Sequence, residues 1–404
     1  DVPERFCVAN RLYGREAESR ALEAAFERVG GGRAELVLVN GYSGIGKTAL
    51  VGELHKPIVA RRGYFIRGKC DQYSRNQPYG ALIQAFQQLL RQLAVEGPQR
   101  RSYWKCELLE ALGENAAAVA ELLPNLALLV GAVPPMPVLP PAENERRFHI
   151  AFAQFVRALS PRAHPLVLFL DDLQWADVPT LKLIEHLLRF EGELCTLIIG
   201  AYRDNEVSEG HPLALSIEAM TGAQLPVQQM HLNDLAPAQV ARLVADTLHC
   251  GEAEVRELAE LCVEKTHGNP FFLSQFLRTL HASGDIRYVR ADGQWRWDIA
   301  QIRQRGMTDN VVELMLQKLR TLAPETQALL TLAAHLGDSF DMRQLMAVGG
   351  QDALPTAAVL WPALQAGMVL PFDEVYKFAQ DAAQLESSRY RFLHDRVQQA
   401  AYEL

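Results

Sequence analysis

The stretch that most constrains the fold is "GYSGIGKT" at 41–48, which matches the pattern G-x-x-x-x-G-K-[ST] in full. It follows the apolar run "AELVLVN" and precedes a segment of helical periodicity, so a strand, a glycine-rich loop and a helix are expected in that order. Backbone N–H groups of such a loop surround phosphate oxygens, and the helix N-terminus adds a positive dipole. We expect Lys47 to reach the β- and γ-phosphates and Thr48 to offer its hydroxyl to Mg²⁺. The expected nucleotide contacts are Gly41, Ser43, Gly44, Ile45, Gly46, Lys47, Thr48 and Ala49. The alternative is a glycine turn that arose by chance.

A second apolar strand, "PLVLFLDD" at 165–172, ends in two carboxylates. Phosphoryl transfer in this class of site needs an acid at a strand tip that holds Mg²⁺, which is the role expected of Asp171. Asp172 beside it would orient or deprotonate the attacking water. The alternative is that both acids are exposed and cap a helix.

The run "CTLIIGAYRD" at 195–204 completes the expected strands and ends in Arg203, where a cation can contact the γ-phosphate. An ordinary surface arginine is the alternative. Strands that alternate with helices predict an α/β fold with a doubly wound parallel sheet. The expected catalytic residues are therefore Lys47, Asp171, Asp172 and Arg203, with Thr48 and Asp171 on the metal.

The sequence as a whole predicts three domains. Residues 1–233 form the sheet domain with a helical insertion at about 80–160, and residues 234–285 form a helical subdomain. Residues 286–404 contain a hairpin and then helices followed by an extended pair, which is typical of a winged-helix-like domain. Trp175 in "LQWAD" could stack on a base or simply pack.

Composition argues against several classes of protein. A formal charge of −8 and a pI near 5.8 disfavour nucleic-acid binding. The six cysteines are dispersed without a C-x-x-C pair, which favours a reducing cytoplasm over a disulfide framework or zinc site. No membrane-spanning segment or leader is visible, and the chain starts without Met, so we interpret it as a fragment of a larger protein.

Six motifs occur here in the order seen in STAND NTPases, the signal-transduction relatives of AAA ATPases. They are "RLYGREAE", "GYSGIGKTALVGELH", "LFLDDLQWAD", "GAYRDNEV", "HGNPFFLSQFL" and "RFLHDRVQQAAY". More narrowly, the chain resembles the ATPase segment of very large bacterial sensor proteins that carry Ser/Thr-kinase-like and histidine-kinase domains. The resemblance covers nearly the whole chain, although the family's Met before the histidine of the last motif is Leu393 here.

The resemblance implies roles for further residues. Gly14, Arg15 and Glu16 would lie beside the adenine, and Pro270 of the Gly268-Asn269-Pro270 element would pack near the base. Arg203 matches the arginine that senses the γ-phosphate. His394 in "LHD" matches a histidine that contacts the β-phosphate of ADP. The residues themselves leave two alternatives for His394 and Asp395: a catalytic dyad, or a packing and helix-capping pair.

The function expected on these grounds is a signal-transduction switch that binds Mg-ATP and ADP, hydrolyses ATP slowly, and acts on flanking signalling domains of the parent chain. Oligomerisation on activation is part of that expectation. The main alternative is a winged-helix transcriptional regulator with an ATPase module. Kinase activity would belong to other parts of the parent chain, since no H-R-D or D-F-G segment is present.

Overall fold

The computed structural model describes residues 5–70, 78–134, 137, 140–304, 319–372, 385–386, 388–393 and 395–404. The chain divides into two compact units, one formed by Gly14–Asn233 and the other by Asp1–Tyr13 together with Asp234–Leu404. The unit of residues 14–233 is called the sheet unit below, and the other is called the helical unit. Each is described by itself.

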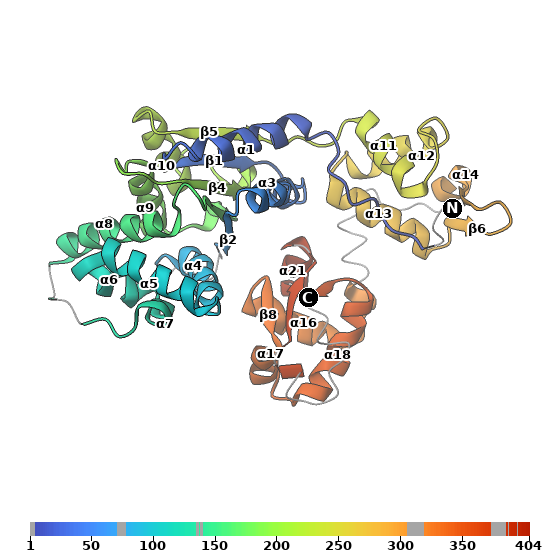
Figure 1. Ribbon diagram of the computed structural model, residues 1–404. Helices are drawn as coiled ribbons and strands as arrows, with labels where there is room; N and C mark the ends of the chain where they lie inside the picture. The colour runs from blue at the N-terminus through green and yellow to red at the C-terminus, as the bar shows by residue number, and fades with distance from the viewer. Residues whose placement is uncertain are drawn as a thin grey trace. The chain divides into compact units, whose positions relative to one another are not determined.

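The sheet unit is built on five parallel strands (Figure 1). They are β1 (Glu35–Asn40), β2 (Tyr64–Lys69), β3 (Leu166–Asp171), β4 (Thr196–Tyr202) and β5 (Val227–His231), in the spatial order β2-β3-β4-β1-β5. Every residue of β3 and β4 is buried, as expected for central strands covered on both faces. The predicted doubly wound parallel sheet is confirmed. The edge strand β5 was not predicted, because its sequence "VQQMH" is polar and only Met230 is buried.

Helices cover both faces of this sheet. Side chains that alternate along the strands, such as Leu36, Leu168 and Ile198, pack in one core with α9 (Val178–Leu188) and α10 (Pro212–Gly222). On the other side α1 (Glu16–Val29) contacts β1 and β4, and α2 (Lys47–Gly52) contacts β4. The short α3 (His55–Ala60) leads on to β2. This two-sided cover leaves the carboxyl ends of β1, β3 and β4 as the place where loops gather.

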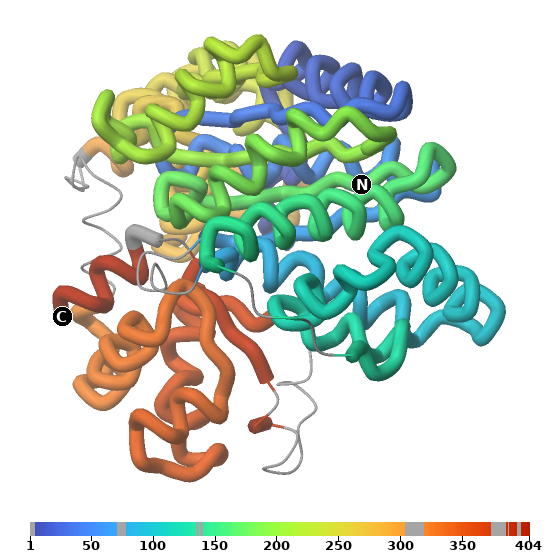
Figure 2. The backbone as a smooth tube through the Cα atoms, turned by 90° about the vertical axis from the view of Figure 1, so that its left-hand side faces the viewer, coloured from blue at the N-terminus to red at the C-terminus, as the bar shows by residue number. Residues whose placement is uncertain are grey.

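A separate helical layer occupies the connection from β2 to β3 (Figure 2, cyan to green). It contains α4 (Gly80–Ala94), α5 (Pro98–Leu112), α6 (Ala116–Leu122), α7 (Ala127–Val130) and α8 (Pro141–Leu159). Phe86 of α4 packs against Phe152 and Phe155 of α8, with ring centroids 5.2 and 5.4 Å apart. The helical stretch expected at about 80–160 is thus a packed element with its own aromatic contacts.

The helical unit begins with three helices and a hairpin. These are α11 (Pro237–Leu248), α12 (Arg256–Thr266), α13 (Pro270–Ala282), β6 (Ile286–Val289) and β7 (Gln294–Trp297), followed by α14 (Ile299–Gln304). The N-terminal segment belongs here rather than with the sheet: Phe6 stacks on His281 at 4.5 Å, and the Tyr13 hydroxyl donates a hydrogen bond to Asp246 at 2.7 Å. The sequence predicts that residues 1–13 belong to the sheet domain. In the described part of this segment, however, Val8 and Tyr13 lie in the core of the helical unit, and Phe6 and Ala9 pack against it.

In the described residues of the last part of the chain, the order is helix, strand, helix, helix, two antiparallel strands, helix. Its elements are α16 (Pro324–Leu336), β8 (Ser339–Asp341), α17 (Met342–Gly349), α18 (Ala353–Gln365), β9 (Val369–Pro371), β10 (Arg389–Phe392) and α21 (Asp395–Tyr402). The three strands form an antiparallel sheet in the order β8-β10-β9. The strand β8 was not predicted, since three residues are too few to show a period. The helix α17, of eight residues, was not predicted either. Within the described ranges, no helix is both long and apolar enough to cross a membrane.

Candidate functional site

The loop of residues 41–46 joins β1 to α2 and depends on glycine for its shape. Gly41, Gly44 and Gly46 have φ values of +142°, +79° and +101°, a region that other residues rarely adopt. A Cβ on Gly41 would lie 2.7 Å from the carbonyl oxygen of Leu232, which is closer than atoms approach. Backbone strain and close packing therefore both explain why the motif has glycine at its first position. The last of these glycines, Gly46, directly precedes the first residue of α2.

Lys47 is buried and folds back over this loop. Its Nζ donates hydrogen bonds to the carbonyl oxygens of Gly41 and Tyr42, at 2.7 and 2.9 Å. Burial lowers the pKa of the ammonium from its ordinary value and the neighbouring Arg203 lowers it further, while Asp172 and Asp171 act in the opposite direction. A cation held by carbonyl oxygens beside a glycine loop is arranged to exchange those partners for phosphate oxygens.

Thr48 and Asp171 come together as the sequence predicts. The Thr48 hydroxyl lies 3.4 Å from Oδ2 of Asp171, although 123 residues separate them. A hydroxyl and a carboxylate fit Mg²⁺, which usually binds one or two protein oxygens together with phosphates and water. Among the residues that the structure describes, no group of three or more His, Cys, Asp or Glu is arranged to hold a metal by itself. Oδ2 of Asp171 also accepts a hydrogen bond from Arg67 at 2.7 Å, a contact that sequence analysis did not foresee.

Asp172 has a left-handed backbone conformation, with φ +53°. Its side chain lies 3.2 Å from Nζ of Lys69 and accepts a hydrogen bond from Gln174 at 3.2 Å. Asp171 and Asp172 are only 8% and 5% exposed, so the alternative of two exposed capping acids is wrong. Burial of both carboxylates is balanced by cations, because an unpaired buried charge is costly.

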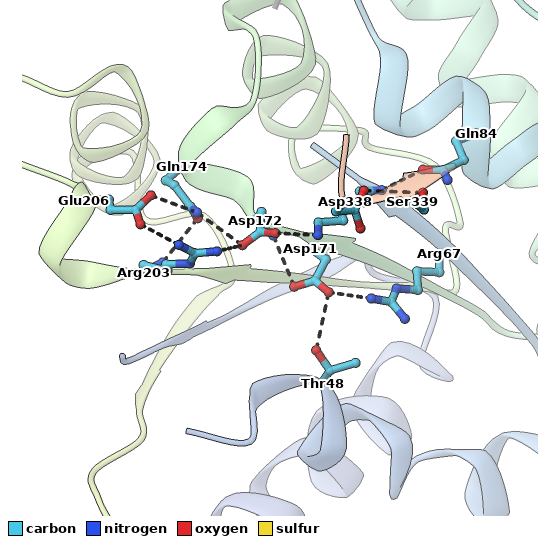
Figure 3. Close-up of polar contacts among 11 residues, drawn as sticks. Thr48, Arg67, Gln84, Asp171, Asp172, Gln174, Arg203, Glu206, Asp338 and Ser339 are labelled. Carbon is cyan, nitrogen blue, oxygen red and sulfur yellow. Dashed lines mark hydrogen bonds and ion pairs between the residues drawn. The ribbon is translucent and has the colours of Figure 1, made fainter. Parts of the chain in front are cut away.

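Arg203 is 7% exposed, which also rules out an ordinary surface arginine. Its Nη1 lies 2.7 Å from Oε1 of Glu206, and its Nη2 lies 3.5 Å from Oδ1 of Asp172 (Figure 3). The guanidinium carbon also lies 5.2 Å from the ring centroid of Trp175, so this tryptophan packs against the arginine. The structure therefore brings together all four residues predicted as catalytic, at the carboxyl ends of β1, β3 and β4.

Four polar partners were missed from the sequence: Arg67, Lys69, Gln174 and Glu206. Arg67 and Lys69 lie on β2, which pairs with β3. Only the sheet order reveals that their side chains reach the two aspartates. Gln174 and Glu206 follow Asp172 and Arg203 by two and three residues, so a local signal for them existed.

Gly14 and Arg15 lie on the sheet unit, beside the end of β5. Gly14 has φ +62°, and Nη2 of the buried Arg15 donates a hydrogen bond to the carbonyl of Asn233. The N–H of the adjacent Leu232 bonds to Asn40 at the end of β1. These contacts connect Arg15 through the β5 end to the start of the glycine loop.

Pro270 and His394 are the two other predicted nucleotide contacts. Pro270 is the first residue of α13 in the helical unit, and Asn269 caps that helix by accepting from the N–H groups of Phe271 and Phe272. Gly268 has φ +79°, and a Cβ there would lie 2.3 Å from the Leu235 carbonyl oxygen. That local geometry explains the residue types, and Pro270 as a nucleotide contact stays a prediction. His394 lies outside the described residues, so its predicted roles stay predictions as well.

Comparison with known proteins gives a family and several distant structures. Residues 11–199 match the model of the AAA ATPase domain. The hybrid signal transduction histidine kinase G of Dictyostelium discoideum is 28% identical over 491 aligned positions, which cover 100% of this chain and 14% of that protein. The chain thus spans about a seventh of the curated relative that it matches.

Two solved structures are similar at low sequence identity. A STAND protein with a tetratricopeptide repeat sensor from Pyrococcus horikoshii has a TM-score of 0.45 and 13% identity, over 99% of this chain and 44% of that chain. The ORC1 protein of Aeropyrum pernix, solved in complex with DNA, has a TM-score of 0.40 and 16% identity, over 98% of this chain and 94% of that chain.

Proposed function

Because residues 11–199 belong to the AAA ATPase domain family, we propose that this chain is a STAND-type switch that binds Mg-ATP, hydrolyses it slowly and reads the difference between ATP and ADP. The proposal depends on one observation. Lys47, Asp172 and Arg203 form a cluster with the Thr48–Asp171 pair at the carboxyl ends of β1, β3 and β4. Each of these side chains has the chemistry that a triphosphate and its metal require.

The proposed roles follow from what each group can do. The glycine loop and Lys47 hold the β- and γ-phosphates, and Thr48 and Asp171 hold Mg²⁺, which would neutralise phosphate charge when bound. Asp172 orients the attacking water. Arg203 contacts the γ-phosphate, which is the group that distinguishes ATP from ADP. A ligand shifts a two-state equilibrium only through its different affinity for the two states, so a switch needs such a residue.

The similarity to a histidine kinase supports the proposal that this chain is part of a larger signalling protein. The relative's name describes a hybrid signal transduction histidine kinase, and this chain aligns with a small share of it. We therefore propose that the chain is the nucleotide-controlled module of a larger signalling protein, with kinase chemistry outside it. Further parts of the proposal are a winged-helix-like role for the part from α16 to α21, contact of Gly14, Arg15, Pro270 and His394 with nucleotide, and oligomerisation on activation.

The direct test is Lys47→Ala. Loss of the buried ammonium removes charge-assisted hydrogen bonds to phosphate, so affinity for both ATP and ADP should fall about a hundredfold or more, which is about 2.7 kcal/mol. Isothermal titration calorimetry with Mg²⁺ present measures this. Lys56→Ala, which removes an exposed lysine from the neighbouring α3, is the matched control and should bind like the wild type. Unchanged affinity in the Lys47 variant would refute the site.

A DNA-binding regulator is the second candidate, favoured by the order helix, strand, helix, helix and two antiparallel strands in the described residues of the last part. The helix α18, which occupies the usual position of a DNA-reading helix, contains no Lys or Arg at all. Phosphate contacts supply most non-specific affinity for DNA, so an uncharged helix is poorly suited to the task. The nucleotide switch is therefore the proposal that we retain.

A further inference from the structure

Arg203 is held by a carboxylate that none of the roles above uses. Glu206 follows Arg203 by three residues in the short 3-10 turn Asp204–Glu206, and its Oε1 accepts a hydrogen bond from Nη1 of Arg203 at 2.7 Å (Figure 3). The Arg203 side chain is 9% exposed and that of Glu206 is 30% exposed. An ion pair with one buried partner is screened less than a surface pair, so it is a substantial restraint on the arginine.

Gln174 fixes this carboxylate in place. Its Nε2 donates to Oε2 of Glu206 at 3.3 Å and to Oδ1 of Asp172 at 3.2 Å, while its Oε1 accepts the backbone N–H of Arg203 at 3.2 Å. Both oxygens of Glu206 therefore have a partner, one from the guanidinium and one from the amide. Gln174 is 1% exposed, so the network is anchored in the interior of the sheet unit.

Of the contacts that Arg203 makes with acids in the described part of the chain, the one with Asp172 is longer than the one with Glu206. Asp172 lies 3.5 Å from the guanidinium, and it is shared with Lys69 at 3.2 Å and with Gln174. Its charge is balanced even when Arg203 moves. Glu206 has the shorter of these two contacts, at 2.7 Å, so a new anion that binds this side of Arg203 would have to displace the Glu206 carboxylate.

We propose that Glu206 is the resting partner of Arg203 and competes with the γ-phosphate of a bound nucleoside triphosphate for that guanidinium. Glu206 thereby sets how strongly the site prefers a triphosphate to a diphosphate. The inference rests on the proposed function, in which Arg203 contacts the γ-phosphate. Carboxylate and phosphate oxygens seek the same fork of N–H donors. A diphosphate leaves the Arg203–Glu206 pair intact, so only the triphosphate has to break it.

The test is Glu206→Gln in the full chain, with Glu209→Gln as the matched control because Glu209 is an exposed carboxylate three residues further on. Calorimetry with Mg²⁺ and the non-hydrolysable β,γ-imido analogue of ATP should show about tenfold tighter binding to the Glu206 variant, which is about 1.4 kcal/mol. Affinity for ADP should stay within about twofold of the wild type. The Glu209 variant should match the wild type for both ligands.

Combination with Arg203→Ala separates competition from simple charge repulsion. In that background Glu206→Gln should not change the affinity for the analogue, since there is no guanidinium left to release. If the variant still binds the analogue about tenfold more tightly, the inference is overturned, because repulsion between the Glu206 carboxylate and the phosphate would then explain the gain. An analogue affinity that is unchanged or weaker in Glu206→Gln also overturns it. Glu206→Ala serves the same purpose if the glutamine variant melts early.

Failure of the underlying function looks different. If the wild-type chain binds neither ADP nor the analogue, the nucleotide site itself is refuted, and this inference with it. If the wild type binds both and Lys47→Ala abolishes both, the site stands. If Glu206→Gln then leaves the affinity for the analogue unchanged, only the proposed role of Glu206 is refuted.

Discussion

At the scale of single residues, the glycine loop shows two separate reasons for glycine at its positions, which are backbone strain and close packing. Gly46 has φ +101° but no atom within 4 Å of where its Cβ would lie, so only backbone strain opposes a side chain there. Gly41 has φ +142° and also faces the Leu232 carbonyl oxygen at 2.7 Å. The two positions should therefore respond differently to the same substitution.

We expect Gly46→Ala to lower the free energy of unfolding by about 1–2 kcal/mol, the cost of a left-handed residue. Gly41→Ala should cost more, because atomic overlap adds to strain. Gly52→Ala, at the end of α2 where φ is ordinary and space is open, should instead be neutral or stabilising by up to about 1 kcal/mol. Urea denaturation of the three variants measures the order, and equal losses at Gly41 and Gly46 would contradict it.

At the scale of elements, the N-terminal segment is attached to the helical unit by a titratable contact. Tyr13 donates to Asp246, and its pKa is raised from 10.0, first by burial and then by this hydrogen bond and the charge of Asp246. A group whose pKa is raised on folding contributes stability that is fully present below its unfolded pKa. That contribution is lost as the pH rises above about 10 towards the folded pKa.

Tyr13→Phe should therefore destabilise the chain at pH 7 by about 1.5 kcal/mol. The difference between wild type and variant should narrow steadily from pH 9 to pH 11, because only the wild type has this group to ionise. The urea midpoint followed by tryptophan fluorescence reports the change. Tyr42→Phe, at a tyrosine of the glycine loop whose side chain is exposed, should leave the midpoint unaltered at both ends of the range. A pH-independent gap would show that Tyr13 acts only through packing.

The elements also show what the sequence could predict. Strands β1, β3 and β4 were predictable because their apolar runs are continuous, which is the mark of strands buried on both faces. The edge strand β5 and the three-residue β8 were missed because neither has a period to read. The site residues on the glycine loop and strand tips were recognisable from local motifs. Arg67 and Lys69 were not, because their contacts with Asp171 and Asp172 depend on which strands are neighbours.

At the scale of the whole molecule, the chain crosses between its two units twice, after Tyr13 and after Asn233. Arg15 ties these two crossings together, since its guanidinium donates to the Asn233 carbonyl and also lies 3.8 Å from Glu18. A switch that couples nucleotide to the helical unit can act through these two connecting segments. Replacement of Arg15 should therefore increase the mobility of both connecting segments.

We expect Arg15→Ala to increase amide hydrogen exchange around residues 13–16 and 232–235 in the absence of nucleotide, since a hydrogen bond from a charged donor worth about 1.5–3 kcal/mol is lost. Amide hydrogen exchange in the buried strands β3 and β4 should be the same in Arg15→Ala as in the wild type. Arg101→Ala, at an exposed position of α5, is the control and should change neither region. In the wild type, ADP and the β,γ-imido analogue should protect the two crossings to different extents, and Arg15→Ala should reduce that difference. Equal protection by both nucleotides in the wild type would mean that these crossings do not carry the signal.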